Sequence, residues 1–163
     1  MSGTSDEPRV VRLTVPEVQY GMALATQRDA CKPDRDSRLS TRLSGFGVHF
    51  AGVIGELCFR KVYGGKLNLS ILPSGDNHVP DVVLSDGREV EVKTSLFQGR
   101  DVELKMEKDE MGTSPFYALV QVTLPDIGRV FPVWSWEYLE PLLTLKDYKY
   151  GDRYVYAPLQ QTA

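Results

Sequence analysis

Two acidic residues and a lysine in the middle of the chain have the types and spacing expected of a metal-dependent site. Asp81 follows Pro80, and Glu91 and Lys93 lie ten and twelve residues further along. Two carboxylates held close together repel each other, and a divalent cation is the commonest reason for a folded protein to keep them. Lys93 falls on the same face of a strand as Glu91, because side chains alternate with a period of two. Such a trio can bind a hard metal ion and hold a phosphate beside it.

The loop between the two expected strands decides whether the carboxylates meet. A two-residue loop, Asp86-Gly87, would pair Asp81 with Val92 and put the carboxylates on opposite faces of the sheet. A three-residue loop, Ser85-Asp86-Gly87, pairs Asp81 with Glu91. Glycine suits the last place of the longer loop, because that residue is usually left-handed. The sequence therefore predicts the three-residue loop or an equivalent bulge, and a slip of one residue would destroy the site.

The composition is that of an ordinary globular domain. The chain has 163 residues, of which 42% are hydrophobic and 25% charged, enough for one domain with a sizeable core. No run is long enough to span a membrane, and residues 1–7 do not form a secretory signal. The two cysteines, Cys31 and Cys58, form neither a zinc cluster nor a disulfide framework, which favours a reducing, cytoplasmic setting.

The net charge of -3 and the pI of about 5.4 count against a protein that coats nucleic acid. They do not exclude an enzyme that touches a few phosphates through a local patch and a metal. Residues 28–42 are net positive and include Arg28. We expect this stretch to be a solvated loop, and the alternative is contact with a phosphate backbone.

The elements that must position the site follow from periodicity and from turn signals. Val18, Met22, Leu24 and Ala25 form the apolar side of a helix over 15–31. A second helix, over 44–63, can be capped by Ser44 and is stopped by Gly64-Gly65. Its apolar side carries five residues, Phe46, Phe50, Val53, Ile54 and Leu57.

That second helix also carries a third candidate acid, Glu56. Gly52 and Gly55 precede Glu56 and would let a strand or a ligand come close to the helix. Taken alone, Glu56 is more often a surface carboxylate than a metal ligand. Its assignment to the site therefore depends on the other residues of the motif.

The remaining elements are mostly strands. The sequence predicts a strand with one wet face over 101–106, a buried central strand over 116–124, a strand over 130–134 with Pro132 at an edge or bulge, a short helix over 135–143 and a small hairpin within 147–158. Residues 1–10 are expected to be disordered or a weak extension, and 11–163 to form a single domain. The order of elements predicts an α/β fold around a mixed sheet flanked by helices.

The chain resembles the PD-(D/E)XK nucleases, which have the restriction-endonuclease-like fold. The matching residues are Glu56 in its Gly-Glu helix, Pro80-Asp81, and the run from Glu91 to Thr94. The resemblance spans roughly residues 44–124, about half the chain, and is nearest to small phage or bacterial members of the superfamily. It implies a Mg²⁺- or Mn²⁺-dependent hydrolase of phosphodiester bonds, with DNA preferred to RNA as the substrate.

The resemblance also implies a role for each matching position. Asp81 and Glu91 would ligate Mg²⁺ or Mn²⁺ together with the backbone carbonyl of Val92. Glu56 would hold a metal-bound water or a second ion. Lys93 would orient the attacking water and stabilise charge on the phosphate. A homodimer, which would place two sites in symmetry, would be the natural way to cut both strands of a duplex.

Two other interpretations remain open at this point. The first is a catalytically inactive nucleic-acid-binding or assembly module of the same fold, because fold does not fix function. The second is a protein-interaction domain whose hairpin matches the motif by chance. Other metal enzymes and nucleotide-hydrolysing motors are disfavoured, because the chain has no His-Glu-x-x-His, no Cys-x-x-Cys and no phosphate-binding loop.

Overall fold

The structure is a computed structural model that describes residues 7–31, 45–68, 80–96, 103–107, 111–145 and 154–158. Its helices are α1 (Val15–Cys31), α2 (Gly45–Tyr63) and α3 (Trp136–Leu139), the last continued by a 3-10 turn (Glu140–Leu142). Its strands are β1 (Arg9–Arg12), β2 (Lys66–Leu67), β3 (Val82–Val83), β4 (Glu89–Ser95), β5 (Glu103–Glu107), β6 (Phe116–Thr123), β7 (Ile127–Val130), β8 (Trp134–Ser135), β9 (Thr144–Leu145) and β10 (Tyr154–Pro158). No helix in the described part is both long and apolar enough to cross a bilayer.

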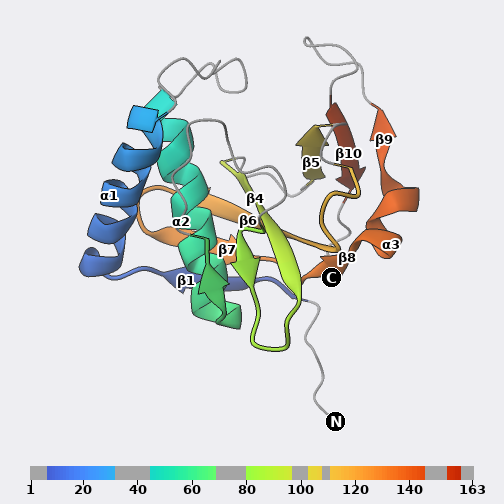
Figure 1. The fold of residues 1–163 in the computed structure, drawn as a ribbon, viewed down its shortest axis with the longest axis horizontal. Coiled ribbons are helices and arrows are strands. Elements are labelled where there is room, and N and C mark those ends of the chain that lie inside the picture. Colours follow the sequence, from blue (N-terminus) through green and yellow to red (C-terminus); the bar gives the residue numbers. More distant parts are fainter. Residues whose placement is uncertain are drawn as a thin grey trace.

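The fold is of the α/β class and is built on a mixed central sheet. Its strand order is β1-β7-β6-β4-β3-β2, with β8 paired to β6. β4 and β6 run parallel, and the other pairs in this sheet are antiparallel. A second, antiparallel sheet has the order β5-β10-β9. In Figure 1, α1 and α2 lie on one side of the central sheet, and the small sheet with α3 lies on the other.

Strand β6 is buried on both faces because a separate apolar cluster covers each of them. Ala118, Val120 and Val122 point toward α2 and join the larger cluster. Tyr117 and Leu119 point the opposite way and pack with the buried side chains of β5 and with Leu139 of α3. The nearly continuous apolar run predicted for 116–124 is therefore confirmed as a central strand.

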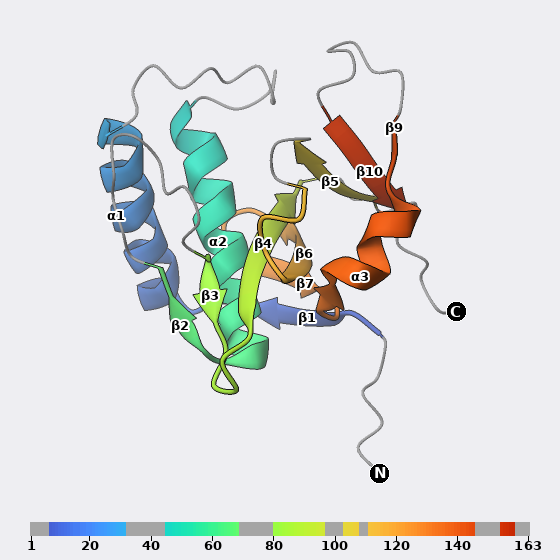
Figure 2. The ribbon, with the colours of Figure 1, turned by 45° about the vertical axis from the view of Figure 1, so that its right-hand side comes forward.

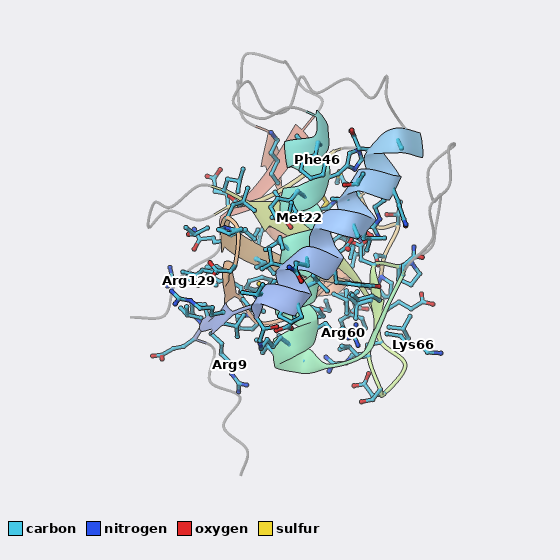
Figure 3. The ribbon with its side chains drawn as sticks, turned by 90° about the vertical axis from the view of Figure 1, so that its left-hand side faces the viewer. Arg9, Met22, Phe46, Arg60, Lys66 and Arg129 are labelled. Atoms are coloured by element: carbon cyan, nitrogen blue, oxygen red, sulfur yellow. The ribbon has the colours of Figure 1, made fainter. Side chains whose placement is uncertain are left out.

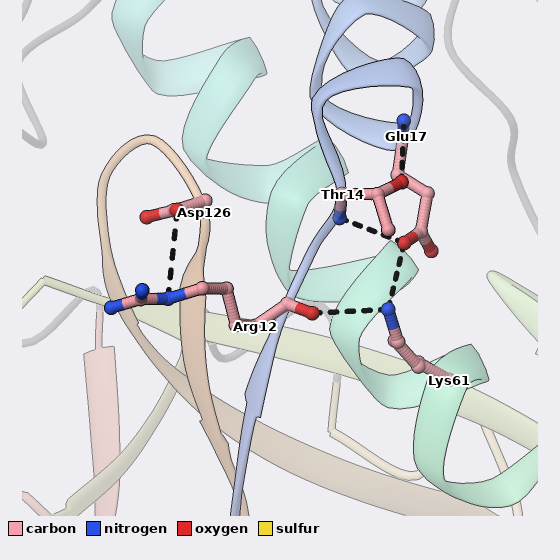
Figure 4. A network of polar contacts seen from close by, with 5 residues as sticks. All are labelled: Arg12, Thr14, Glu17, Lys61 and Asp126. Atoms are coloured by element: carbon pink, nitrogen blue, oxygen red, sulfur yellow. Dashed lines mark hydrogen bonds and ion pairs between the residues drawn. The ribbon is translucent and has the colours of Figure 1, made fainter.

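Helix α1 begins with reciprocal hydrogen bonds between Thr14 and Glu17. The Thr14 N–H donates to Glu17 Oε1 at 2.9 Å, and the Glu17 N–H donates to Thr14 Oγ1 at 3.3 Å. Lys61 of α2 donates to the same Glu17 oxygen at 2.7 Å and to the Arg12 carbonyl at 3.0 Å (Figure 4). This network ties β1, the start of α1 and the end of α2 together, away from the acids at positions 56, 81 and 91.

The contact face of α1 differs from the predicted one at Met22. Leu24 and Ala25 are buried as expected and Val18 packs against the core, but Met22 is exposed and lies on the outer side of the helix (Figure 3). The face that meets α2 runs through Gly21, where an added Cβ would approach Ile54 and Leu57 at 3.2 Å. Because glycine contributes little to a hydrophobic pattern, the sequence predicts an apolar side that passes through Met22 and not through Gly21.

Helix α2 agrees with its prediction over the residues that the structure describes. Val53, Ile54 and Leu57 are buried, and Phe46 stacks on Phe50 at the edge of the core. The helix ends at Tyr63, and Gly64 and Gly65 follow with φ of 75° and 96°, a left-handed region that favours glycine. The expected cap, Ser44, lies outside the described residues.

One strand prediction and the prediction for the N-terminal residues need correction. The strand expected over 130–134 is instead split into β7, which ends at Val130, and β8, which begins at Trp134. Pro132 lies in the gap, where its missing N–H cannot continue a ladder. The expected disorder of residues 1–10 also extends too far, because Arg9 and Val10 pair with Val130 and Arg129 in β1.

The C-terminal part forms the small sheet together with β5. The strand predicted over 101–106 corresponds to β5, with Leu104 and Met106 buried on its dry side. β10 pairs with β5 along its length and with β9 over a shorter stretch. The hairpin predicted within 147–158 thus has its second strand in β10, whereas residues 146–153 lie outside the described residues.

Candidate functional site

The β3–β4 hairpin has the register that brings the two predicted metal ligands together. Val82 pairs with Val90 and Val83 with Glu89, and continuing this register by one residue places Asp81 opposite Glu91. The Leu84 N–H donates to the Arg88 carbonyl at 2.9 Å, which leaves a three-residue loop between them. Its last residue is Gly87, with φ of 90°. The predicted loop length is confirmed.

Strand β4 carries its apolar and its polar residues on opposite faces. Val90 and Val92 are buried in the cluster under α2. Glu91 and Lys93 lie on the other face, and Lys93 Nζ stands 3.4 Å from Glu91 Oε1 with the two side chains 18% and 27% exposed. Figure 2 shows β2, β3 and β4 side by side next to α2. The strand therefore presents an acid and an ammonium together at the place where β3 begins.

Asp81 is held against β4 by a backbone hydrogen bond. The Val92 N–H donates to Asp81 Oδ2 at 2.8 Å. Burial raises the pKa of Asp81 well above its ordinary value, and the negative charges of Glu56 and Glu91 raise it further. The Val92 N–H and the Lys93 ammonium act in the opposite direction on this pKa. Asp81 is thus a desolvated carboxyl group with two other carboxyl groups as neighbours.

Glu56 reaches the hairpin because α2 packs closely on β4. A Cβ added at Gly55 would collide with Thr94 Oγ1 of β4, so only glycine permits this approach. The expectation that Gly55 allows a strand to come close is confirmed. At Gly52 an added Cβ would meet none of the described residues within 4 Å, so no described strand approaches there, and the approach of a ligand to Gly52 stays a prediction.

The environment of Glu56 is buried and electrostatically coupled to the hairpin. Glu56 is 8% exposed. Burial raises its pKa, and the charge of Glu91 acts in the same direction, whereas Arg28 and a hydrogen bond with Asp81 act to lower it. The net direction is upward, because the desolvation of a carboxylate outweighs the single cation beside it. Glu56, Asp81, Glu91 and Lys93 therefore form one interacting group that joins α2, β3 and β4.

Arg28 is a member of this group that the sequence motif does not contain. It belongs to the net-positive stretch over 28–42 and also to the helix predicted over 15–31, and it lies in the last turn of α1. Its Nη1 stands 3.1 Å from Glu56 Oε2, with the two side chains 19% and 10% exposed. Arg28 follows Gly21, Leu24 and Ala25 along the stripe of α1 that faces α2, and Gly21 hides this stripe from a hydrophobic pattern. The part of that stretch beyond α1, residues 32–42, lies outside the described residues.

The donor set has the chemistry of a magnesium or manganese site. Carboxylate oxygens are the ligands that these hard cations prefer, and a divalent charge would relieve the repulsion that raises the pKa of Asp81. Within the described ranges, however, no three His, Cys, Asp or Glu side chains are already gathered as a ligand set. Arg28 contacts Glu56, and Lys93 contacts Glu91. The carboxylates of Glu56, Asp81 and Glu91 are therefore neighbours that do not converge on one common position.

Val92 takes part in the site through its backbone, for which only the carbonyl was predicted to have a role. Its N–H binds Asp81, as described above. Its carbonyl, the atom expected to ligate a metal, stays a prediction.

Comparisons with known proteins do not assign a family to this chain. No protein-family model matches the chain, and a search of curated proteins gives no significant match. The resemblance to the PD-(D/E)XK nucleases therefore rests on the sequence motif and on the geometry of Glu56, Asp81, Glu91 and Lys93.

Proposed function

We propose that this protein is a metal-dependent nuclease with the restriction-endonuclease-like fold, which hydrolyses phosphodiester bonds in DNA. One observation carries the proposal. The hairpin register puts Asp81 opposite Glu91, with Lys93 on the same face, and a glycine contact brings Glu56 to them from α2. A chance hairpin match gives no reason for a buried acid from a helix to join the same group.

The burial of the acids supports a functional site rather than a solvated surface. Glu56 is among the few buried charged or polar residues in the described part of the chain, and Asp81 is desolvated enough for its pKa to rise. Grouped, buried carboxyl groups cost stability, and perturbed pKa values of this kind concentrate at functional sites. The grouping of Glu56 and Asp81 with the half-buried Glu91 is explained if the three carboxylates hold a cation.

Each residue of the site has a role in this proposal. Asp81 and Glu91, with the Val92 carbonyl, would hold Mg²⁺ or Mn²⁺, and Glu56 of α2 would hold a metal-bound water or a second ion. The bound cation supplies a more acidic water and neutralises charge that develops on the phosphate. Lys93 places its ammonium beside Glu91, where it orients the water and contacts a phosphate oxygen. Water attacks phosphorus and gives up a proton to solvent, while the bond to the leaving oxygen breaks and that oxygen takes a proton from solvent.

The acidic net charge of -3 agrees with a site that acts locally. A chain of this charge does not attract long stretches of nucleic acid by counterion release. Affinity for the substrate would depend on the cation and on a few basic side chains near the site. A symmetric dimer would allow both strands of a duplex to be cut, and it stays a prediction.

Incubation with a panel of nucleic acids tests the proposed function. Single-stranded, duplex and branched DNA and single-stranded RNA are each incubated with Mg²⁺, Mn²⁺ or a chelator. We expect cleavage of DNA with either cation and none with chelator or with the Asp81→Asn variant. Binding of DNA without cleavage under any condition would favour the inactive module of the same fold. Neither binding nor cleavage would leave the chance resemblance as the explanation.

A further inference from the structure

Arg28 makes more contacts around the site than a single ion pair requires. Its Nη1 donates to Glu56 Oε2 at 3.1 Å and to Glu56 Oε1 at 3.4 Å. Its Nη2 donates to the backbone carbonyl of Asn68 at 2.8 Å. One guanidinium therefore joins α1 to α2 and to the residue that follows β2.

Asn68 continues the connection to the other acid of the site. The Asn68 N–H donates to the carbonyl of Asp81 at 2.8 Å, and Asp81 Oδ2 in turn accepts from the Val92 N–H at 2.8 Å. Arg28 is thus bonded directly to Glu56 and through one residue to the backbone of Asp81. The two acids come from elements far apart in sequence, and this chain of hydrogen bonds fixes their separation.

We propose that Arg28 is a positioning residue of the nuclease site, one that holds Glu56 and the Asp81 segment in the mutual placement that metal binding and cleavage need. The inference rests on the proposed function and adds to it a residue that the sequence motif does not contain. Arg28 acts through Glu56 and Asn68, and we assign it no contact with the substrate.

The chemistry of the guanidinium suits this task. Its planar, rigid array of donors can satisfy a carboxylate and a carbonyl at the same time, and it keeps its charge at any ordinary pH. A lysine ammonium at the same place is a compact point charge on a flexible stem and gives no such fixed geometry. Arg28→Lys should therefore keep the charge next to Glu56 and lose part of the alignment.

A purely stabilising role explains the arrangement less well. A buried ion pair is weak as a source of stability, because an apolar pair of similar size serves as well or better. The helices already have a second ion pair, Lys61 with Glu17 at 2.7 Å, whose side chains are 36% and 35% exposed. That pair joins the same two helices without contacting any acid of the site, so Lys61→Met is a matched control for Arg28→Met.

The first experiment measures single-turnover cleavage of DNA as a function of Mn²⁺ concentration for the wild type and for the Arg28→Met, Arg28→Lys and Lys61→Met variants. We expect Arg28→Met to lower the rate at saturating DNA, or raise the half-saturating Mn²⁺ concentration, by about 10- to 100-fold. Arg28→Lys should fall between it and the wild type, and Lys61→Met should stay within about twofold of the wild type. Equal rates for Arg28→Met and Lys61→Met would overturn the inference, as would a loss confined to the KM for DNA.

The second experiment needs neither metal nor cleavage. Amide hydrogen exchange is followed at Asn68 and Val92, whose N–H groups bind the backbone and side chain of Asp81. We expect Arg28→Met to speed exchange at both amides by about tenfold or more, and Lys61→Met to leave them unchanged. Unchanged protection in Arg28→Met would overturn the positioning role. If the wild type fails to cleave DNA while these amides respond as expected, the proposed function is at fault and the positioning role is not.

Discussion

Asp81 has two properties that favour the binding of a cation and that lower the stability of the folded protein when the carboxyl group is charged. It is desolvated, and Glu56 and Glu91 add negative charge beside it, so that its pKa is raised well above the ordinary value. The neutral form is therefore favoured in the folded protein. Asp81 contributes fully to stability below the ordinary carboxyl pKa of about 4, and that contribution is lost as the pH rises through the raised pKa.

The variant Asp81→Asn should separate stability from activity. The amide stays neutral, and its oxygen can still accept from the Val92 N–H. We expect the free energy of unfolding at pH 7 without added metal to rise by about 1 kcal/mol relative to the wild type, with the gain fading toward pH 4. Urea unfolding across this pH range measures it. Asp86→Asn, on the exposed loop, should show no such gain, because hydrogen bonds with Arg88 lower the pKa of Asp86. A loss of stability for Asp81→Asn at pH 7 would contradict the account.

The same pKa direction predicts how cleavage depends on pH. Protons compete with the cation for Asp81, so the group must ionise before it can bind a metal. Because its pKa is raised, we expect cleavage at limiting Mn²⁺ to fall as the pH is lowered through that raised pKa, and high Mn²⁺ to shift the fall to lower pH. A pH–rate profile at two Mn²⁺ concentrations tests this. If cleavage falls at the same pH at both Mn²⁺ concentrations, the group that titrates is not a ligand of the metal.

Lys93 should act on the phosphate and not on the metal. Its ammonium lies 3.4 Å from Glu91 Oε1, on the face that carries both acids. We expect Lys93→Ala to keep Mn²⁺ binding and to lose cleavage by about 100-fold or more, because one positioned cation is removed from the developing charge. Calorimetric titration with Mn²⁺ and single-turnover cleavage of DNA measure the two properties. Normal cleavage by Lys93→Ala would remove this residue from the mechanism.

Among the elements, the pairing of α2 with β4 decides whether Glu56 belongs to the site. The helix can approach because Gly55 has no side chain where Thr94 Oγ1 lies. A change in this spacing would move Glu56 away from Asp81 without altering any acid. The contact therefore offers a way to test the placement of the site separately from its chemistry.

The variant Gly55→Ala should push α2 away from β4. We expect it to lower the free energy of unfolding by about 1–3 kcal/mol and to weaken Mn²⁺ binding, because the added methyl collides with Thr94. The double variant Gly55→Ala with Thr94→Ala should recover part of both losses. Gly52→Ala is the control in the same helix, and we expect it to be neutral or stabilising by up to about 1 kcal/mol. Equal effects of the two alanines in urea unfolding would show that the Thr94 contact does not position Glu56.

Helix α1 and the hairpin show what local sequence signals could and could not predict. The span of α1 and the three-residue loop were predicted correctly, because the helix period, Pro33 beyond the helix end and Gly87 are short-range signals. Arg28 was missed because its meaning depends on which face of α1 meets α2. Gly21 concealed that face, since its contact with α2 depends on having no side chain.

At the scale of the whole molecule, the central strand was easier to predict than its surroundings. The apolar run of β6 indicated burial on both faces, but nothing in it named the covering layers. Strands as short as β2 and β8 have too few residues to show a period, and β1 reads as a polar terminus because its edge position leaves most of it exposed. The pairing of β10 with β5 joins segments distant in sequence, and no local signal specifies it.

The most direct test of the central claim is a calorimetric titration of Mn²⁺ into the wild type, Asp81→Asn and Asp86→Asn at neutral pH. Both variants remove one acid from the same hairpin, but Asp86 lies on the exposed loop and pairs with Arg88. We expect the wild type and Asp86→Asn to bind Mn²⁺ alike, and Asp81→Asn to lose binding. An absence of Mn²⁺ binding by the wild type, or equal binding by all three proteins, would contradict the account.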